Sequence, residues 1–437
     1  MLFKKRCFYA LKIVKFVGLF HSLILKIIVI MGNKLKIGII KETKIPVDHR
    51  VVLPPKQAKE LLDKYASSIE IVVQRSDIRS FKDEEYEALG FSLVDSVDDC
   101  DWLIGVKEVQ IDKLISNKNY VFFSHTAKKQ PYNRPLLQAI MQKQITLVDH
   151  EYLTDKNGIR LVAFGYWAGL VGAYNGLIAY GKKTGTYSLK PAYQCHDKDE
   201  VFAELKKITI KEPIKILLTG GGRVASGAMD TLDHLGIKKV SPEDYLAYDF
   251  DYPVYAQIDP WHYTRRKDGE PFDLQHFFEH PDMYESTFEP YPKVTDMWVA
   301  CHFWDPKSPV FLTKEDYKRD DFRIGLIADV SCDIAEPIPS TLRASTIDDP
   351  LYGYDKFTEK EVDAFAPNAV TVMAVDNLPG ELPRNASEAF GEAFVQKVFP
   401  SIIDGDHDGV IERATIVKEG KLPPLFSYLE DFAAGKE

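Results

Sequence analysis

The chain has 437 residues, of which 45% are hydrophobic and 27% charged, a composition typical of a globular protein with two or three domains. The formal net charge of −10 argues against general affinity for nucleic acid, because such affinity requires a basic face. The cysteines form no C-x-x-C pair, so the sequence predicts neither a metal site nor a disulfide framework, and a cytoplasmic location is expected.

Residues 1–30 are basic and apolar, and the composition changes abruptly at Met31. A signal peptide or a membrane anchor is one interpretation. However, Lys12, Lys15 and Lys26 interrupt the apolar run, and no small-residue cleavage site is evident. We therefore expect no stable membrane insertion. We favour a translation start at Met31 and exclude residues 1–30 from the prediction of the fold.

Between residues 34 and 148, short apolar runs alternate with segments of helical periodicity, which is typical of a doubly wound parallel sheet. Ligands of such sheets bind beyond the carboxyl ends of the strands. Lys107 and His125 each follow a predicted strand, so both are candidates for function, against the alternatives of a surface lysine and a buried structural histidine. We expect strands at 34–40, 69–73, 102–106, 120–123 and 146–148, and helices at 54–65, 83–89 and 134–143.

Residues 163–181 are apolar and rich in small side chains. Glycines at near-helical spacing favour a buried helix that packs closely against its neighbours rather than a membrane span. We expect this helix to link two halves of the protein.

A glycine-rich turn follows the predicted strand 216–219 and precedes the predicted helix 225–235. Gly220, Gly222 and Ala225 fit the G-x-G-x-x-[G/A] dinucleotide fingerprint. The first glycine permits the tight turn, the second lets the backbone approach a pyrophosphate, and the alanine allows close packing of helix on strand. The alternative is a glycine turn without a ligand, but the strand before and the helix after favour a nucleotide site.

Further strands are expected at 254–258, 297–301, 324–330 and 369–375, so the predicted class is α/β with two Rossmann-like, doubly wound lobes separated by a cleft. We assign residues 31–163 and 381–437 to a substrate lobe and residues 164–380 to an NAD(P)-binding lobe. The last residues are expected to return to the first lobe because terminal helices need a surface on which to dock.

Several motifs occur in collinear order from about residue 35 onward and resemble one superfamily, which contains alanine dehydrogenase, the transhydrogenase nucleotide subunit and the saccharopine dehydrogenases. The segment IGIIKETKIPVDHRVVLPP, residues 37–55, resembles the opening shared by the superfamily. Four later motifs resemble the L-lysine-forming saccharopine dehydrogenases and the lysine–ketoglutarate reductase domain. They are FFSHTAKKQ (122–130), RLVAFGYWAG (160–169), IADVSCD (327–333) and VDNLPGELPRNASEAFG (375–391).

The resemblance implies an oxidoreductase acting on CH–NH donors that interconverts saccharopine with L-lysine and 2-oxoglutarate, using a nicotinamide cofactor for hydride transfer. Lys107 matches the family's base for the secondary amine, and burial beside a like charge would lower its pKa toward neutrality. His125 matches the second acid–base group, which would serve hydrolysis of the imine. Glu151 is a candidate for holding either group in its protonation state, and Lys128 is a weaker candidate in the same region.

The resemblance also implies residues that bind the two ligands. Arginines suit the carboxylates of the substrates, because their guanidinium groups can bind a carboxylate through two hydrogen bonds. For Arg50 and Arg160, a surface ion pair is the alternative, and Asp329 and Asp376 could each be ordinary turn residues. The expected substrate residues are Arg50, Lys107, Gln130, Arg160, Phe164, Asp329 and Ser331, and the expected cofactor residues are Gly220, Gly222, Arg223, Asp259, Phe303, Asp376, Asn377 and Leu378.

The choice between NAD and NADP depends on the end of the second strand of the dinucleotide lobe. Asp259 closes the predicted strand 254–258, where an acidic side chain would accept a hydrogen bond from the ribose 2′-hydroxyl and repel a 2′-phosphate. Arg265 and Arg266 follow nearby and could instead serve NADP. We favour NAD and keep NADP as the alternative.

Two other functions remain open. An alanine-type dehydrogenase would use the same lysine and histidine on ammonia and a smaller 2-oxo acid, although the motifs AFGYWAG and NLPGELP argue against it. A transhydrogenase-like nucleotide-binding module without its own substrate would have no use for Lys107, His125, Arg50 and Arg160 together. The expected partners are small-molecule substrates, and no oligomeric state is predicted.

Overall fold

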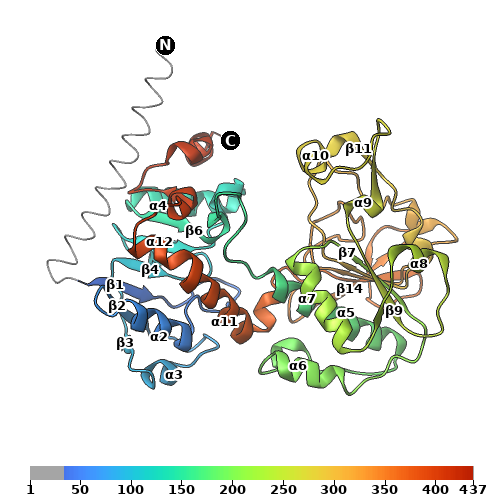
Figure 1. Cartoon of the computed structure of the whole chain (residues 1–437), viewed down its shortest axis with the longest axis horizontal. Coiled ribbons are helices and arrows are strands. Elements are labelled where there is room, and N and C mark those ends of the chain that lie inside the picture. The colour runs from blue at the N-terminus through green and yellow to red at the C-terminus, as the bar shows by residue number, and fades with distance from the viewer. Residues whose placement is uncertain (1–33, 437) are drawn as a thin grey trace, which may run out of the picture. The chain divides into compact units, whose positions relative to one another are not determined.

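The computed structural model describes residues 34–436, so the prediction for residues 1–30 lies outside the described residues. The chain divides into two compact units (Figure 1). The first unit joins the described residues up to Ala163 with Pro383–Glu437, and the second unit is the continuous segment Phe164–Leu382.

The first unit is built on a seven-stranded sheet in the order β17-β6-β5-β4-β1-β2-β3. Neighbouring strands pair in parallel, except that β17 runs antiparallel to β6 at one edge. The strands are β1 (Leu35–Ile39), β2 (Ile69–Gln74), β3 (Ser92–Val94), β4 (Trp102–Ile104), β5 (Asn119–Phe122), β6 (Thr146–Asp149) and β17 (Thr415–Val417). The helices are α2 (Pro55–Lys64), α3 (Asp83–Glu87), α4 (Arg134–Gln142), α11 (Pro383–Ala393), α12 (Phe399–Ile403), α13 (Val410–Ala414) and α14 (Glu430–Ala433).

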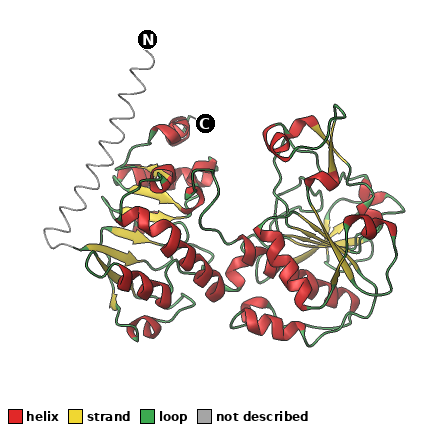
Figure 2. Ribbon diagram, in the orientation of Figure 1, coloured by secondary structure: helices red, strands yellow, loops and turns green. Residues whose placement is uncertain are grey.

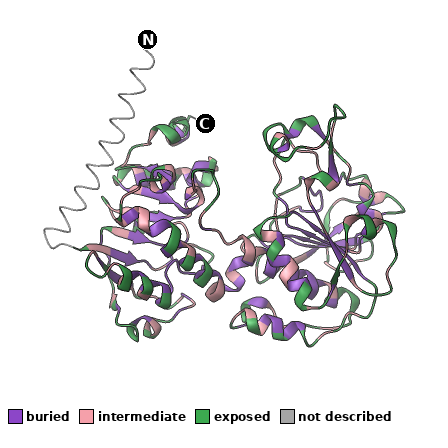
Figure 3. Cartoon of the chain, in the orientation of Figure 1, coloured by how far each residue is buried: buried purple, intermediate pink, exposed green. Residues whose placement is uncertain are grey.

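The core of the first unit forms where the apolar face of α4 meets the sheet. Leu103, Phe122 and Leu147 come from three neighbouring strands, and each is fully buried in one cluster with Leu137 and Ile140 of α4. Burying a side chain of this size contributes about 1.5–3 kcal/mol. The central strands of the unit are accordingly coloured mostly as buried in Figure 3, whereas β3 at the edge of the sheet has no buried residue.

The second unit contains an eight-stranded sheet in the order β15-β14-β16-β13-β12-β7-β9-β8 (Figure 2). The six strands from β16 to β8 are parallel, whereas β14 and β15 are antiparallel at one edge. The strands are β7 (Lys215–Thr219), β8 (Lys238–Lys239), β9 (Val254–Ile258), β12 (Met297–Ala300), β13 (Leu326–Asp329), β14 (Leu351–Asp355), β15 (Glu361–Val362) and β16 (Ala369–Met373), with a separate hairpin of β10 (Thr264–Arg266) and β11 (Tyr284–Ser286). The helices are α5 (Gly165–Thr184), α6 (Lys198–Leu205), α7 (Arg223–His234), α8 (Pro242–Ala247), α9 (Pro260–Tyr263) and α10 (Leu274–Glu279).

Helices α5 and α7 approach each other so closely that only glycine fits at the contact. A Cβ atom on Gly169 would lie 1.7 Å from the carbonyl oxygen of Val224, and one on Gly227 would lie 1.9 Å from that of Tyr166. This contact explains the run of small residues in α5. Within residues 34–436, no helix is long and apolar enough to cross a membrane.

The predicted α/β class with two largely parallel sheets is confirmed. The antiparallel edge strands β14, β15 and β17, the hairpin β10–β11 and the short helices α8, α9 and α10 were not predicted. These elements are two to six residues long, too short for a periodic pattern to identify them.

Candidate active site

Polar residues follow four neighbouring strands of the first unit, at one edge of its sheet. Strands β1, β4, β5 and β6 are adjacent and parallel, so their carboxyl ends meet at the same edge. The segments that follow these strands carry Glu42, Lys107, His125 and His150 respectively. The structure thus places the two predicted acid–base residues beyond neighbouring strands.

A carboxylate fixes the ring of His125. Nδ1 of His125 lies 2.6 Å from Oε1 of Glu108, and Nζ of Lys44 donates to Oε2 of the same group at 2.8 Å. Burial alone would raise the pKa of Glu108, but the hydrogen bonds from His125 and Lys44 outweigh it and hold the pKa at about 2. Glu108 is therefore a carboxylate that engages Nδ1, and Nε2 is the nitrogen left for proton exchange.

The environment of Lys107 favours its neutral amine. Burial lowers the pKa of Lys107, and the positive charge of Arg50 lowers it further, against the opposing charges of Asp48 and Glu108. A neutral amine is the form that can accept a proton. The two causes expected from the sequence, burial and a neighbouring positive charge, therefore both lower the pKa of Lys107.

Arg50 itself is buried and forms a two-bond ion pair with Asp48. Its Nε donates to Oδ1 of Asp48 at 2.9 Å and its Nη2 donates to Oδ2 at 2.6 Å. Although burial opposes ionisation, the charge and hydrogen bonds of Arg50 lower the pKa of Asp48 below its usual range. The positive charge of Arg50 is thus anchored near Lys107, and its role toward a substrate carboxylate stays a prediction.

Three residues of this cluster were not identified from the sequence, namely Glu42, Asp48 and Glu108. Glu42 and Asp48 lie in the opening motif that was recognised, and Glu108 directly follows Lys107. An acidic residue beside a candidate base is the signal that could have found Glu108, since such pairs commonly tune acid–base groups.

Glu151 was expected to hold Lys107 or His125 in its protonation state, but it bonds to two other residues. Its Oε1 receives Nζ of Lys128 at 3.1 Å and also Nη2 of Arg160. Burial opposes ionisation of Glu151, but these two cations lower its pKa. The expectation is corrected, because Glu108 and not Glu151 is bonded to His125, and Glu151 instead organises Lys128 and Arg160.

Two further predicted substrate residues occupy defined places. Oε1 of Gln130 accepts a hydrogen bond from the hydroxyl of Tyr132 at 2.5 Å, just after the turn that carries His125. Phe164 is half-buried and immediately precedes α5, at the start of the second unit. The roles of both stay predictions.

In the second unit, the predicted cofactor residues follow five parallel strands. Strands β9, β7, β12, β13 and β16 are consecutive neighbours, so their carboxyl ends share one edge of the sheet. Each strand end or the loop beyond it carries one or more of the residues predicted for cofactor or substrate. In sheet order these are Asp259, then Gly220, Gly222 and Arg223, then Phe303, then Asp329 and Ser331, and finally Asp376, Asn377 and Leu378.

The glycine turn has the shape that a dinucleotide requires. Gly220 has φ +100°, and a Cβ atom there would lie 2.6 Å from the carbonyl oxygen of Cys301. Gly222 is exposed and has nothing within 4 Å of its Cβ position, and it precedes α7 without a capping side chain. The free N–H groups and positive dipole end of this helix favour a phosphate group. The residues present therefore fit a dinucleotide.

Asp259 lies directly beside this turn, whereas the two arginines considered for NADP are already paired. A Cβ atom on Gly221 would lie 2.2 Å from Oδ1 of Asp259. Arg265 pairs with Glu285 at 2.6 Å, and Arg266 pairs with Asp268 at 2.6 Å.

The remaining predicted residues of this edge differ in exposure. Asp329 is fully buried and accepts hydrogen bonds from its own loop, including one from Oγ of Ser331 at 2.7 Å and one from Thr341 at 2.6 Å. Phe303 is 82% exposed, and Asp376 is exposed as well. Asp329 thus holds its loop in place, while Phe303 and Asp376 present free surface.

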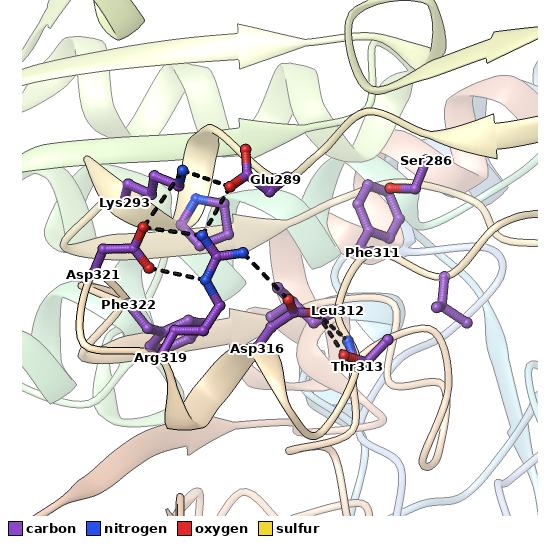
Figure 4. Close-up of a pocket in the computed structure, with 12 residues that line it drawn as sticks. Ser286, Glu289, Lys293, Phe311, Leu312, Thr313, Asp316, Arg319, Asp321 and Phe322 are labelled. Atoms are coloured by element: carbon purple, nitrogen blue, oxygen red, sulfur yellow. Dashed lines mark hydrogen bonds and ion pairs between the residues drawn. The ribbon is translucent and has the colours of Figure 1, made fainter.

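One further pocket of about 210 Å³ lies elsewhere in the second unit (Figure 4). Phe311, Leu312 and Phe322 are among the apolar residues that line it. Lys293 and Arg319 also line it and are paired with acidic neighbours. None of the predicted site residues lines this pocket. In the described part of the chain, no three His, Cys, Asp or Glu side chains gather as a metal site.

Comparison with protein families identifies the segment that carries the lysine and histidine. Residues 38–171 match the model described as "Alanine dehydrogenase/PNT, N-terminal domain". This segment is thus similar to the N-terminal domain of alanine dehydrogenase and PNT proteins. It contains β1, β4, β5 and β6 and with them Lys107, His125, Arg50 and Glu108. The predicted resemblance to the superfamily is confirmed.

Curated relatives extend the similarity beyond the alanine dehydrogenase/PNT domain. Alpha-aminoadipic semialdehyde synthase of Arabidopsis thaliana is 29% identical over 91% of this chain and 41% of its own length. The NAD(+), L-lysine-forming saccharopine dehydrogenases of Schizosaccharomyces pombe and Yarrowia lipolytica are 28% and 27% identical, over 88% and 84% of this chain and 97% and 92% of theirs.

The chain spans less than half the length of the semialdehyde synthases that it matches but nearly the whole of these fungal enzymes. A solved L-alanine dehydrogenase superposes with a TM-score of 0.62 at 16% identity, covering 91% of this chain and 99% of that one. At this identity the superposition shows a shared fold.

Proposed function

We propose that this protein is an oxidoreductase acting on CH–NH donors that interconverts saccharopine with L-lysine and 2-oxoglutarate. The observation that carries the proposal is the joint placement of Lys107 and His125 beyond neighbouring strands, with Glu108 bonded to the histidine and Arg50 near the lysine. The similarity to L-lysine-forming saccharopine dehydrogenases over nearly their whole length supports the same reaction.

The acid–base roles follow from the two environments. Lys107, with its lowered pKa, would take the proton from the secondary amine of saccharopine before that nitrogen becomes an imine. His125, oriented through Nδ1 by Glu108, would use Nε2 to activate water for hydrolysis of the imine and to return a proton to the leaving amine. The reverse direction uses the same two groups with their protons exchanged.

The second unit would hold the nicotinamide dinucleotide, which supplies or accepts the hydride. Gly220, Gly222 and the N-terminus of α7 would receive the pyrophosphate, and Asp259 would accept a hydrogen bond from the ribose 2′-hydroxyl. The position of Asp259 beside the turn and the pairing of Arg265 and Arg266 favour NAD over NADP. Phe303, Asp376, Asn377 and Leu378 stay predicted cofactor residues, and the cleft between the lobes stays a prediction.

A spectrophotometric panel tests the reaction. Oxidation of the reduced dinucleotide is followed with 2-oxoglutarate plus lysine, and separately with pyruvate plus ammonia, each with NADH and with NADPH. We expect turnover with lysine, 2-oxoglutarate and NADH. Turnover only with pyruvate and ammonia would establish the alanine-type alternative. Dinucleotide binding without turnover in either mixture would establish the non-catalytic module.

A further inference from the structure

We propose that Glu42, supported by His150, is a positioning residue that fixes the backbone of Lys107 and so aims its side chain at the substrate. Neither Glu42 nor His150 has a part in the acid–base steps, yet both are buried at the edge of the sheet where Lys107 lies. The proposal rests on the proposed role of Lys107, and it adds what holds that residue in place.

Glu42 binds two successive backbone amides with its two oxygens. Oε1 accepts the N–H of Val106 at 2.6 Å, and Oε2 accepts the N–H of Lys107 at 2.9 Å. Glu42 can reach them because β1 lies beside β4, and the ladder between the two strands continues through the amide of Ile40 to the carbonyl of Ile104. The carboxylate therefore replaces the strand partner that these amides lose where β4 ends.

The carbonyl ends of the same two peptide groups are also held. The carbonyl of Gly105 accepts a hydrogen bond from Nε2 of His150 at 2.9 Å, and the carbonyl of Val106 accepts one from the amide of Phe123 at 2.9 Å. Each of the two peptide planes before Lys107 is thus bonded at both its oxygen and its nitrogen. With both planes fixed, the point from which the Lys107 side chain leaves the backbone is fixed as well.

The surroundings of His150 suit a role as a neutral donor. Its ring lies 5.0 Å from those of Phe123 and Phe390 and 5.9 Å from that of Phe394. Burial lowers the pKa of His150 to about 4, so the ring is neutral near pH 7. Because Nε2 donates to a carbonyl, Nε2 carries the single proton of the neutral ring.

The charges that face Glu42 make its hold on the backbone dependent on pH. Burial and the charge of Asp48 raise the pKa of Glu42, the two amides and Arg50 oppose the rise, and the pKa lies at about 8. A carboxylate can accept from both amides, whereas a protonated carboxyl has one oxygen occupied by hydrogen. The bonds from Glu42 to the two amides therefore strengthen as pH rises through about 8, where Glu42 ionises.

Hydrogen–deuterium exchange with residue-level fragmentation tests the hold directly and does not depend on the substrate. In Glu42→Gln, we expect the amides of Val106 and Lys107 to exchange about tenfold faster or more, while the amides of β2 stay protected. The matched control is Glu60→Gln, on the exposed face of α2, which should change neither segment. Unchanged exchange at Val106 and Lys107 in Glu42→Gln would overturn the proposal.

Kinetics test whether the hold matters for the reaction. With saccharopine and NAD, Glu42→Gln should lower kcat about tenfold or more, with KM and the Kd for NAD within about twofold, and the deficit should be larger at pH 9 than at pH 7. His150→Gln keeps a donor near the position of Nε2 and should retain most of kcat, whereas His150→Leu should lose it.

The two experiments separate the possible failures. Faster exchange with an unchanged kcat would overturn the positioning role. An inactive wild type would count against the proposed function alone, because the exchange measurement would still report on Glu42. A deficit in Glu42→Gln that is the same at pH 7 and pH 9 would overturn the dependence on ionisation.

Discussion

The two sheet edges that carry the candidate residues are built in opposite ways. In the first unit, the edge is crowded with buried or half-buried charges, and Glu42, Asp48, Arg50 and Glu108 are each held by hydrogen bonds. In the second unit, the glycine turn is open, with Gly222 free of neighbours. An edge that adjusts proton affinity needs fixed charges close by, whereas an edge that receives a phosphate needs exposed backbone.

The largest effect should come from removing Lys107, the proposed base of the crowded edge. Lys107→Met should lower kcat by about 10²–10⁴-fold, because it removes the proposed acceptor for the proton of the secondary amine. The Kd for NAD should stay nearly unchanged, since Lys107 lies in the other unit from the glycine turn. Steady-state kinetics and dinucleotide titration give both values, with His125→Gln as a second variant. Full activity in either variant would remove its assigned role.

Lowering the pH should reduce the stability of both units, because each unit contains a buried histidine. Burial lowers the pKa of His150 to about 4 and that of His302 to about 3, so the folded protein binds fewer protons than the unfolded chain. Stability is therefore complete above the ordinary histidine pKa of about 6.5 and falls as pH drops toward 4, by roughly 3 kcal/mol for His150.

Urea unfolding at pH 7 and pH 5 measures this dependence. His150→Gln and His302→Gln should each flatten it, while the exposed control His407→Gln should leave it unchanged. A pH dependence that persists undiminished in both buried variants would show that other groups cause it.

Two glycines of the open edge should respond differently to alanine. At Gly220, φ is +100° and a side chain would strike the backbone of Cys301, so Gly220→Ala should destabilise the protein by about 1–3 kcal/mol. At Gly222 the space is open and φ is −90°, so Gly222→Ala should fold normally and only weaken NAD binding. Thermal unfolding and NAD titration separate the two effects. Equal stability of the two variants would contradict this view of the turn.

The smallest effect concerns the choice of cofactor. Asp259→Ser should shift the preference from NAD toward NADP by about tenfold, because it removes both an acceptor for the 2′-hydroxyl and a charge that repels a 2′-phosphate. Arg265→Ala should leave the preference unchanged, since Arg265 pairs with Glu285. Comparing kcat/KM for the two cofactors decides this, and a loss of NADP use in Arg265→Ala would instead assign that arginine to the phosphate.

The sequence predicted elements and site candidates well where a single local pattern was enough to identify them. Strand β9 was predicted with the bounds that the structure shows, and Lys107 and His125 were selected because each follows an apolar strand. Contacts between residues far apart in the sequence could not be predicted from such local signals. Nothing local in the sequence indicates that Glu42 binds a backbone amide 65 residues away, just beyond a strand end, or that Glu151 bonds to Arg160 rather than to Lys107 or His125. Such contacts depend on strand order, which a single sequence does not specify.

Strand β17 has a consequence for the order in which the protein forms during synthesis. The second unit is one uninterrupted stretch of chain, so a nascent polypeptide can complete it once Leu382 has left the ribosome. The first unit cannot be completed then, because its sheet ends at β6 until β17 arrives from Thr415–Val417. The first unit, which is synthesised first, thus completes its folding last. Until β17 arrives, the edge of β6 is unpaired and can pair with other chains.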